Sequence, residues 1–180
     1  MAHPSTLYRF RIELSDVDRG VYETLDFRVA MHPSETPAFL LTRVIAYALN
    51  FGDGLEFAPG GLSDPDAPAL RALEPHGATR LWIEIGNPSA RKLHKASKAA
   101  REVKVYTYKD PELLLKEIAS EKVHQASRIE IRSLPQSLLN ELAQTLERDN
   151  QWTLVHTDGS LMIGIGERSL QAELGRHSAT

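Results

Sequence analysis

The chain has 180 residues, of which 42% are hydrophobic and 25% charged, close to globular averages, which excludes disordered, collagen-like and membrane-embedded classes. It contains no cysteine, so disulfides, thiolate metal sites and thiol nucleophiles are excluded together. The formal net charge of −3 neither favours nor opposes a nucleic-acid partner. At this length we expect a single domain spanning residues 1–180.

The N-terminal sequence lacks the basic start and apolar stretch of a secretory signal. The longest apolar run, 38–49, is interrupted by Arg43 and is shorter than the roughly 20 residues that a membrane-spanning helix needs. We therefore expect a cytoplasmic protein with no membrane contact and no disulfide-linked partner. A monomer is slightly favoured as its oligomeric state.

The first quarter of the chain predicts a β-hairpin followed by a helix. Residues 7–14 and much of 25–31 alternate apolar and polar side chains, and turn-forming residues lie between them. Ser34 or Thr36 then offers an N-cap for an apolar helix that runs from Pro37 to about residue 50. Residues 51–75 are rich in proline, glycine and acids, and predict a loop with a short strand at 55–57.

The middle of the chain alternates between strand and helix patterns. Strands are predicted at 80–86, 103–108 and 128–132, and helices at about 89–101 and 111–121. Strands that alternate with helices imply a parallel sheet with right-handed crossovers. We therefore expect an α/β protein with a mixed central sheet and flanking helices.

The C-terminal part predicts one more helix and a second hairpin. Ser133 is the expected cap of a helix that begins at Pro135, and strands at 151–156 and 160–165 flank an Asp-Gly turn. These strands are expected to pair with the N-terminal hairpin. The predicted division is a core of about 33–150 and a small β annex of about 5–32 with 151–175, and both tails look loosely held.

Glu84 is the first residue whose chemistry needs an explanation. In the strand 81–86, Leu81, Ile83 and Ile85 point to one side of the sheet, and Trp82 and Glu84 to the other. With helices on both faces, a carboxylate there needs a partner, since an unpaired buried charge costs several kcal/mol. An acidic loop precedes this strand and a basic helix follows it. Two carboxylates with nearby cations are suited to hold Mg²⁺ or Mn²⁺ next to a phosphodiester.

Three segments of the chain resemble the YaeQ family. They are HPSET at 32–36, LWIEIGNP at 81–88 and RKLHKA at 91–96. Their order, the flanking hairpin and the chain length also match, so the resemblance covers nearly the whole protein.

The resemblance implies a variant of the PD-(D/E)XK fold, which is found in restriction endonucleases and related phosphodiesterases. In that superfamily an Asp after a Pro, and an acid two residues before a Lys on a neighbouring strand, bind the metal and help to activate water. Asp66 follows Pro65 and matches the first element, and Glu84 matches the second. Gly86 stands where the lysine is expected.

The resemblance also implies auxiliary residues. In several branches the lysine lies on the following helix, where Lys95 is the first candidate and Lys92 the second. Arg91 precedes Lys95 by four residues and shares its helix face. Some members use an acid of the first helix, for which Glu35 is the candidate, with Arg43 near the same face.

Two functions follow as hypotheses. The first is a Mg²⁺- or Mn²⁺-dependent nuclease acting on DNA or RNA, with Asp66 and Glu84 as ligands and Lys95 as orienter of phosphate and water. The alternative is a non-catalytic module that binds nucleic acid or a protein through the same cleft. Structural explanations stay open: Asp66 could cap a helix, Glu35 could stabilise a helix end, and Glu84 could form an ion pair with Arg91, Lys95 or Arg43.

Overall fold

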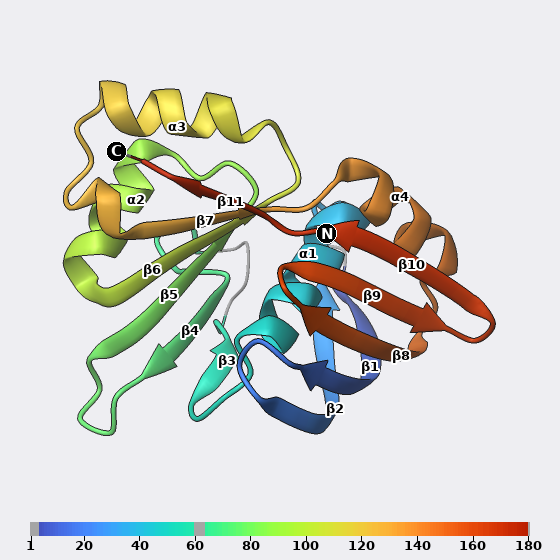
Figure 1. Ribbon diagram of the computed structural model, residues 1–180. Helices are drawn as coiled ribbons and strands as arrows, with labels where there is room; N and C mark the ends of the chain where they lie inside the picture. The colour runs from blue at the N-terminus through green and yellow to red at the C-terminus, as the bar shows by residue number, and fades with distance from the viewer. Residues whose placement is uncertain (1–3, 60–63, 180) are drawn as a thin grey trace.

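The computed structural model describes residues 4–59 and 64–179, which form four α-helices and two β-sheets (Figure 1). The five-stranded sheet contains β1 (Thr6–Asp16), β2 (Val21–Met31), β8 (Asp149–Thr157), β9 (Ser160–Ile165) and β10 (Arg168–Glu173). The six-stranded sheet contains β3 (Leu55–Phe57), β4 (Leu70–Leu73), β5 (Thr79–Ile85), β6 (Ala100–Thr107), β7 (Ile129–Ser133) and β11 (Gly175–Ser178). The helices are α1 (Pro37–Leu49), α2 (Ala90–Ala99), α3 (Pro111–Ser120) and α4 (Gln136–Thr145), with a 3₁₀ turn at Ala126–Arg128.

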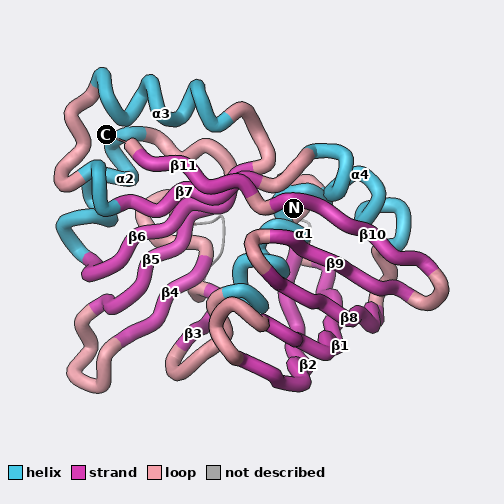
Figure 2. Tube along the Cα trace, viewed as in Figure 1, coloured by secondary structure: helices cyan, strands magenta, loops and turns pink. Residues whose placement is uncertain are grey.

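Both sheets are mixed. The six-stranded sheet has the order β11-β7-β6-β5-β4-β3, in which β5, β6 and β7 are parallel, as the alternating pattern predicted. The other sheet has the order β10-β9-β8-β1-β2, and β1 pairs in parallel with β8. The N-terminal hairpin and strands β8, β9 and β10 therefore share one sheet (Figure 2). The division of the chain into a core and an annex stays a prediction.

Helix α1 lies between the two sheets and joins them through one hydrophobic core (Figure 1). Its side chains Leu41 and Ile45 are fully buried, together with Phe10 of β1 and Ile83 of β5. A second core forms where α2 and α3 cover the opposite face of the six-stranded sheet, around Leu93, Val105 and Leu114. Strand β5 is thus covered on both faces, as its sequence predicted. Among the described helices, none combines the length and the apolar content needed to cross a bilayer.

Two capping predictions have different outcomes. Thr36 caps α1, because its hydroxyl accepts a hydrogen bond of 3.2 Å from the backbone N–H of Phe39. The prediction that Ser133 caps α4 is wrong. Ser133 ends β7, its hydroxyl lies 2.9 Å from Nε2 of His177, and Pro135 occupies the N-cap position without a side-chain hydrogen bond.

Three strands lie outside the predicted ones. Strand β4 falls in the segment that was predicted as loop. Its residues form a strand because their backbone pairs with β3 and β5, and no local sequence pattern marks them. The prediction of a loosely held C-terminal tail is wrong for β11, which pairs with β7. Strand β10 lies within the predicted annex and pairs with β9, and Leu170 and Leu174 of this segment are buried.

A candidate acid and lysine pocket

The centre of the candidate site is the buried carboxylate of Glu84 on β5. Only 3% of the residue is exposed. The indole Nε1 of Trp82 donates a hydrogen bond of 2.7 Å to Oε1, and Nζ of Lys92 lies 3.1 Å from Oε2. Burial raises the pKa of Glu84 above its ordinary value, and Lys92 and Trp82 only partly oppose this shift. Glu84 is therefore a carboxylate whose charge is costly and depends on its few partners.

Lys92 reaches Glu84 because of the way in which α2 begins. Ser89 is the N-cap and accepts a hydrogen bond of 3.2 Å from the backbone N–H of Lys92, which fixes the first turn of the helix. The side chain of Lys92 is only 25% exposed and turns towards β5. The ion-pair partner of Glu84 is thus Lys92, which was not among the three partners expected for a purely structural pair.

Lys95 and Asp66 lie farther out. Their side chains are 52% and 62% exposed, and Nζ of Lys95 lies 3.5 Å from Oδ1 of Asp66. Arg91 is also exposed. Together with Lys95, Lys92 and Asp66 it lines a surface pocket, which we call the outer pocket. The structure therefore brings Asp66 and Lys95 together, but in a solvated ion pair beside the buried one.

The loop before β4 places Asp64, rather than Asp66, on the pocket that contains Glu84. Asp64 and Pro65 line this inner pocket with Glu84 and Lys92, and Oδ1 of Asp64 accepts a 3.0 Å hydrogen bond from the backbone N–H of Asp66. Pro65 and Lys92 line both pockets, so the inner and outer pockets adjoin. Asp66 does not cap a helix, because the chain continues into β4. The Asp-Pro-Asp sequence was the available signal for Asp64.

Glu35 and Arg43 form the third part of the inner pocket. Nη2 of Arg43 lies 2.6 Å from Oε2 of Glu35 and donates to the carbonyl oxygen of Ala30 at 2.8 Å. Their side chains are only 6% and 2% exposed, and burial lowers the pKa of Arg43 although Glu35 opposes this. Nε of Arg43 has no hydrogen-bond partner among the described residues. Glu35 lies in the turn before α1 rather than on a face of the helix, and it is held to Arg43 of α1 as a buried ion pair.

The acids of the two pockets suit a hydrated divalent ion better than a closed metal cage. Within residues 4–59 and 64–179, no three side chains of His, Cys, Asp or Glu form a metal-binding group. Mg²⁺ usually keeps several waters and binds through one or two carboxylates and the substrate phosphates. Trp82 and Lys92 each engage one oxygen of Glu84, and a carboxylate has further lone pairs for an ion. Asp64 lines the same pocket as Glu84, whereas Asp66 lines the adjoining one.

The fold and the pocket define a class of mixed α/β proteins with two sheets, in which a buried strand carboxylate meets a lysine of the next helix. A sequence model with the description "YaeQ protein" matches residues 1–174. The chain belongs to the YaeQ family.

Relatives and solved structures agree with this assignment. The chain is 33% identical over 108 residues to an uncharacterized protein YaeQ of Escherichia coli (strain K12), a match that spans 60% of this chain and 59% of that relative. It is 26% identical over 176 residues to an uncharacterized protein YaeQ of Salmonella typhi, which covers 97% of this chain and 96% of the relative. The crystal structure of YaeQ protein from Pseudomonas syringae superposes with a TM-score of 0.90 at 30% identity, over 99% of both chains. The crystal structure of the Xanthomonas axonopodis pv. citri protein gives 0.89 at 29% identity, over 98% of this chain and 99% of that one.

Proposed function

We propose that the chain is a metal-dependent phosphodiesterase that acts on nucleic acid and that its core is a variant of the PD-(D/E)XK fold. The observation that carries the proposal is the buried Glu84 carboxylate, paired with Lys92 at 3.1 Å in a pocket that Asp64 also lines. A carboxylate with a raised pKa in a pocket with a specific cation is typical of functional sites. Fold alone does not carry this proposal.

The proposed metal ligands are Glu84 and one acid of the Asp-Pro-Asp turn. Asp64 lies on the pocket of Glu84, whereas Asp66 lies on the adjoining pocket, so both are candidates. The metal, Mg²⁺ or Mn²⁺, would supply charge stabilisation and a lowered pKa for a bound water. The second ligand is therefore the part of the proposal that substitutions must decide.

The proposed cations have separate tasks. Lys92 contacts Glu84 directly and is the residue placed to hold a phosphate oxygen and orient a water beside it. Arg91 and Lys95 line the outer pocket and present positive charge to the phosphates on either side of the scissile bond. Glu35 and Arg43 hold the wall of the inner pocket through their buried ion pair. In this arrangement Lys92 replaces Lys95 as the residue closest to the chemistry.

The test is a cleavage assay on single- and double-stranded DNA and RNA with Mg²⁺ or Mn²⁺. Glu84→Gln and Lys92→Met are expected to lower the rate by roughly 100-fold or more, because each removes a group that contacts the reacting centre. Asp64→Asn and Asp66→Asn run side by side identify the second ligand. Glu167→Gln, on an exposed turn, is the matched control and is expected to leave the rate unchanged.

Two outcomes would contradict the proposal. They are the absence of cleavage on all four substrates, and cleavage that survives both Glu84→Gln and Lys92→Met. Calorimetric titration with Mn²⁺ separates a failure to bind metal from a failure to cleave.

A non-catalytic nucleic-acid module is the second candidate, and the solvated face of α2 favours it. Arg91, Lys92 and Lys95 line one open pocket, and such a cluster binds phosphates without any metal. Salt-dependent binding of the same oligonucleotides without cleavage is the expected result for this function. Lys95→Met would then weaken binding to all sequences alike.

A further inference from the structure

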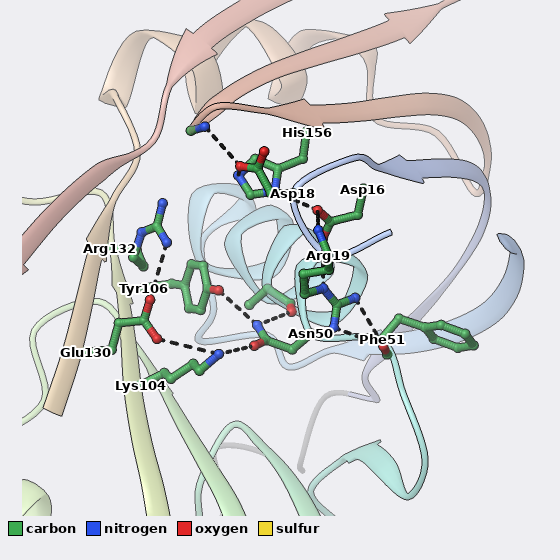
Figure 3. Close-up of polar contacts among 12 residues, drawn as sticks. Asp16, Asp18, Arg19, Asn50, Phe51, Lys104, Tyr106, Glu130, Arg132 and His156 are labelled. Atoms are coloured by element: carbon green, nitrogen blue, oxygen red, sulfur yellow. Dashed lines mark hydrogen bonds and ion pairs between the residues drawn. The ribbon is translucent and has the colours of Figure 1, made fainter. Parts of the chain in front are cut away.

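A third cavity, of about 450 Å³, lies where the two sheets meet at the C-terminal end of α1 (Figure 3). Its wall takes side chains from the β1–β2 turn, from β6 and β7, and from the β8–β9 hairpin. None of its lining residues belongs to the inner pocket, which lies towards the other end of α1. The inner pocket is lined by Phe39 and Arg43 of α1 and the cavity by Leu49, so the two sites lie about 9–15 Å apart along the helix.

The buried imidazole of His156 is the unusual group in this wall. The residue is 7% exposed, and Nδ1 lies 2.9 Å from Oδ1 of Asp16, which is fully buried. Asp16 also accepts from Nε of Arg19 at 2.8 Å, and because a carboxylate only accepts hydrogen bonds, Nδ1 of His156 is the donor to Asp16. Nε2 is buried without any hydrogen-bond partner among the described residues. A buried polar atom of this kind calls for an explanation.

The surroundings of Nε2 explain it as a protonation site. Oδ2 of Asp18 lies 3.5 Å away, which is within ion-pair distance but is not a hydrogen bond in this geometry. The backbone N–H groups of Asp158 and Gly159 donate to Asp18 and lower its pKa. A neutral His156 would turn a lone pair towards this carboxylate, whereas a protonated one would donate to it.

Three cations on the opposite wall keep donors free for a ligand. Arg132 uses Nε on the carbonyl oxygen of Gly175 and Nη1 on Glu130, and its Nη2 has no hydrogen bond among the described residues. Nζ of Lys104 donates one hydrogen bond of 2.8 Å to Oδ1 of Asn50 and lies 3.5 Å from Oε2 of Glu130. Arg176 makes no side-chain hydrogen bond or ion pair within residues 4–59 and 64–179.

The hydroxyl of Tyr106 adds a neutral donor to this wall. Tyr106 accepts a hydrogen bond of 2.9 Å from Nδ2 of Asn50, and burial raises its pKa to about 12. The hydroxyl therefore keeps its hydrogen at neutral pH and can donate it to an acceptor in the cavity. The wall thus offers this donor beside those of Arg132, Arg176 and Lys104.

A metal ion does not fit the same groups. Asp16 and Asp18 face opposite nitrogens of the His156 ring, so the two carboxylates and one ring nitrogen cannot converge on a single ion. In the part of the chain that the structure describes, no group of metal-ligating side chains forms here. The unused donors on the opposite wall favour an anion instead.

We propose that this cavity binds an oxyanion of the phosphate or sulfate class through Arg132, Arg176 and Lys104, and that His156 takes up a proton as the anion binds. The charged and titratable groups that line the cavity around His156 are Asp16, Asp18 and Arg19 from the β1–β2 end, Lys104 and Tyr106 from β6, Glu130 and Arg132 from β7, and Arg176 from β11. Asp16 and Asp18 lie 2.9 and 3.5 Å from the two ring nitrogens of His156, and an anion bound in the cavity would add further negative charge near the ring. By linkage, the anion binds more tightly as the pH falls through the range in which histidine titrates. The site does not depend on the proposed nuclease activity.

The test uses sulfate, which stays a dianion across neutral pH, and side-chain ¹H–¹⁵N spectra of the full chain. Sulfate is expected to shift the Nε resonances of Arg132 and Arg176, and to move the titration of the His156 ring to higher pH. Arg132→Gln and Arg176→Gln are expected to weaken sulfate binding by about tenfold each, because each removes a charge-assisted hydrogen bond. His156→Gln keeps the binding but loses its pH dependence. Arg148→Gln, which removes an exposed charge elsewhere, is the matched control and leaves the binding unchanged.

A second probe distinguishes a free oxyanion from a phosphate ester. Adenosine 5′-monophosphate with adenosine as its control is titrated in the same way. Shifts at Arg132 with the monophosphate but not with adenosine support the site and assign it to an ester. The proposal is overturned if neither anion shifts these resonances, or if the titration of wild-type His156 is the same with and without sulfate. The wild-type measurement decides the question even if a variant fails to fold.

Discussion

Glu84 and Asp16 are both nearly inaccessible carboxylates, and they lie towards opposite ends of α1. Asp16 is held by the backbone and side chain of Arg19 and by His156, so its two oxygens are surrounded by donors. Glu84 has one donor on each oxygen, one of which is a lysine that is itself partly solvated. The number of donors, rather than burial, therefore separates a carboxylate that anchors the fold from one with capacity left for a ligand.

Asp16→Asn is expected to have the largest effect. It removes the charge that His156 and Arg19 both face, and breaking a buried charged network costs about 3 kcal/mol in the free energy of unfolding. Urea unfolding measures this loss. Asp26→Asn is the matched control on the same hairpin, because Asp26 is 49% exposed and pairs with Arg9 at the surface. Equal losses in the two variants would refute the anchoring role of Asp16.

Glu84→Gln is expected to change how the free energy of unfolding depends on pH. Burial raises the pKa of Glu84, so the folded protein holds this proton to a higher pH than the unfolded chain does. The stability that Glu84 contributes is complete below its ordinary pKa of 4.5 and is lost as the pH rises through the raised value. The wild type should therefore lose stability relative to Glu84→Gln between acidic and neutral pH, by about 1.4 kcal/mol for each unit of pKa difference.

The measurement is the difference in unfolding free energy between the two proteins at several pH values. Other groups cancel in this difference, and Glu56→Gln, on the exposed strand β3, is the control for a titrating acid at the surface. The prediction fails if the difference in unfolding free energy stays constant with pH, or if it increasingly favours the wild type as the pH rises. Either result would show that burial does not raise the pKa of Glu84.

Lys95→Met is expected to have the smallest effect. The ion pair with Asp66 is exposed on both sides, and such pairs contribute less than about 1 kcal/mol. Lys92→Met leaves Glu84 without its cation and is expected to cost more, about 2 kcal/mol. Thermal unfolding of the two variants ranks them. A larger loss for Lys95→Met would mean that the outer pair, rather than the inner one, supports the structure.

Much of the fold was predictable where the pattern is local. The strands and helices of residues 79–133 follow from the alternation of strand and helix patterns in the sequence. Strand β4 was missed because its four residues, Leu70–Leu73, become a strand only by pairing between β3 and β5. The short strand β11 was missed for the same reason. Tertiary pairing decides such segments.

The residues singled out in the sequence lie within one helical turn and two loop positions of those that line the inner pocket. Glu84 was identified because a polar residue on a doubly covered strand stands out in the sequence. Lys92 and Lys95 differ by three residues, and the choice between them depends on the helix phase that Ser89 sets. His156 and Asp16 are 140 residues apart, and neither belongs to a motif, so no sequence signal could join them.

The parallel pairing of β1 with β8 has a consequence for synthesis on the ribosome. The N-terminal hairpin is made first, but the strand that covers its inner edge comes from residues 149–157. At ordinary translation rates this edge waits on the order of 10 s for its partner. An uncovered strand of 11 residues is a template for pairing with other chains. Nascent copies of this protein are therefore most exposed to aggregation along β1, until the last quarter of the chain emerges.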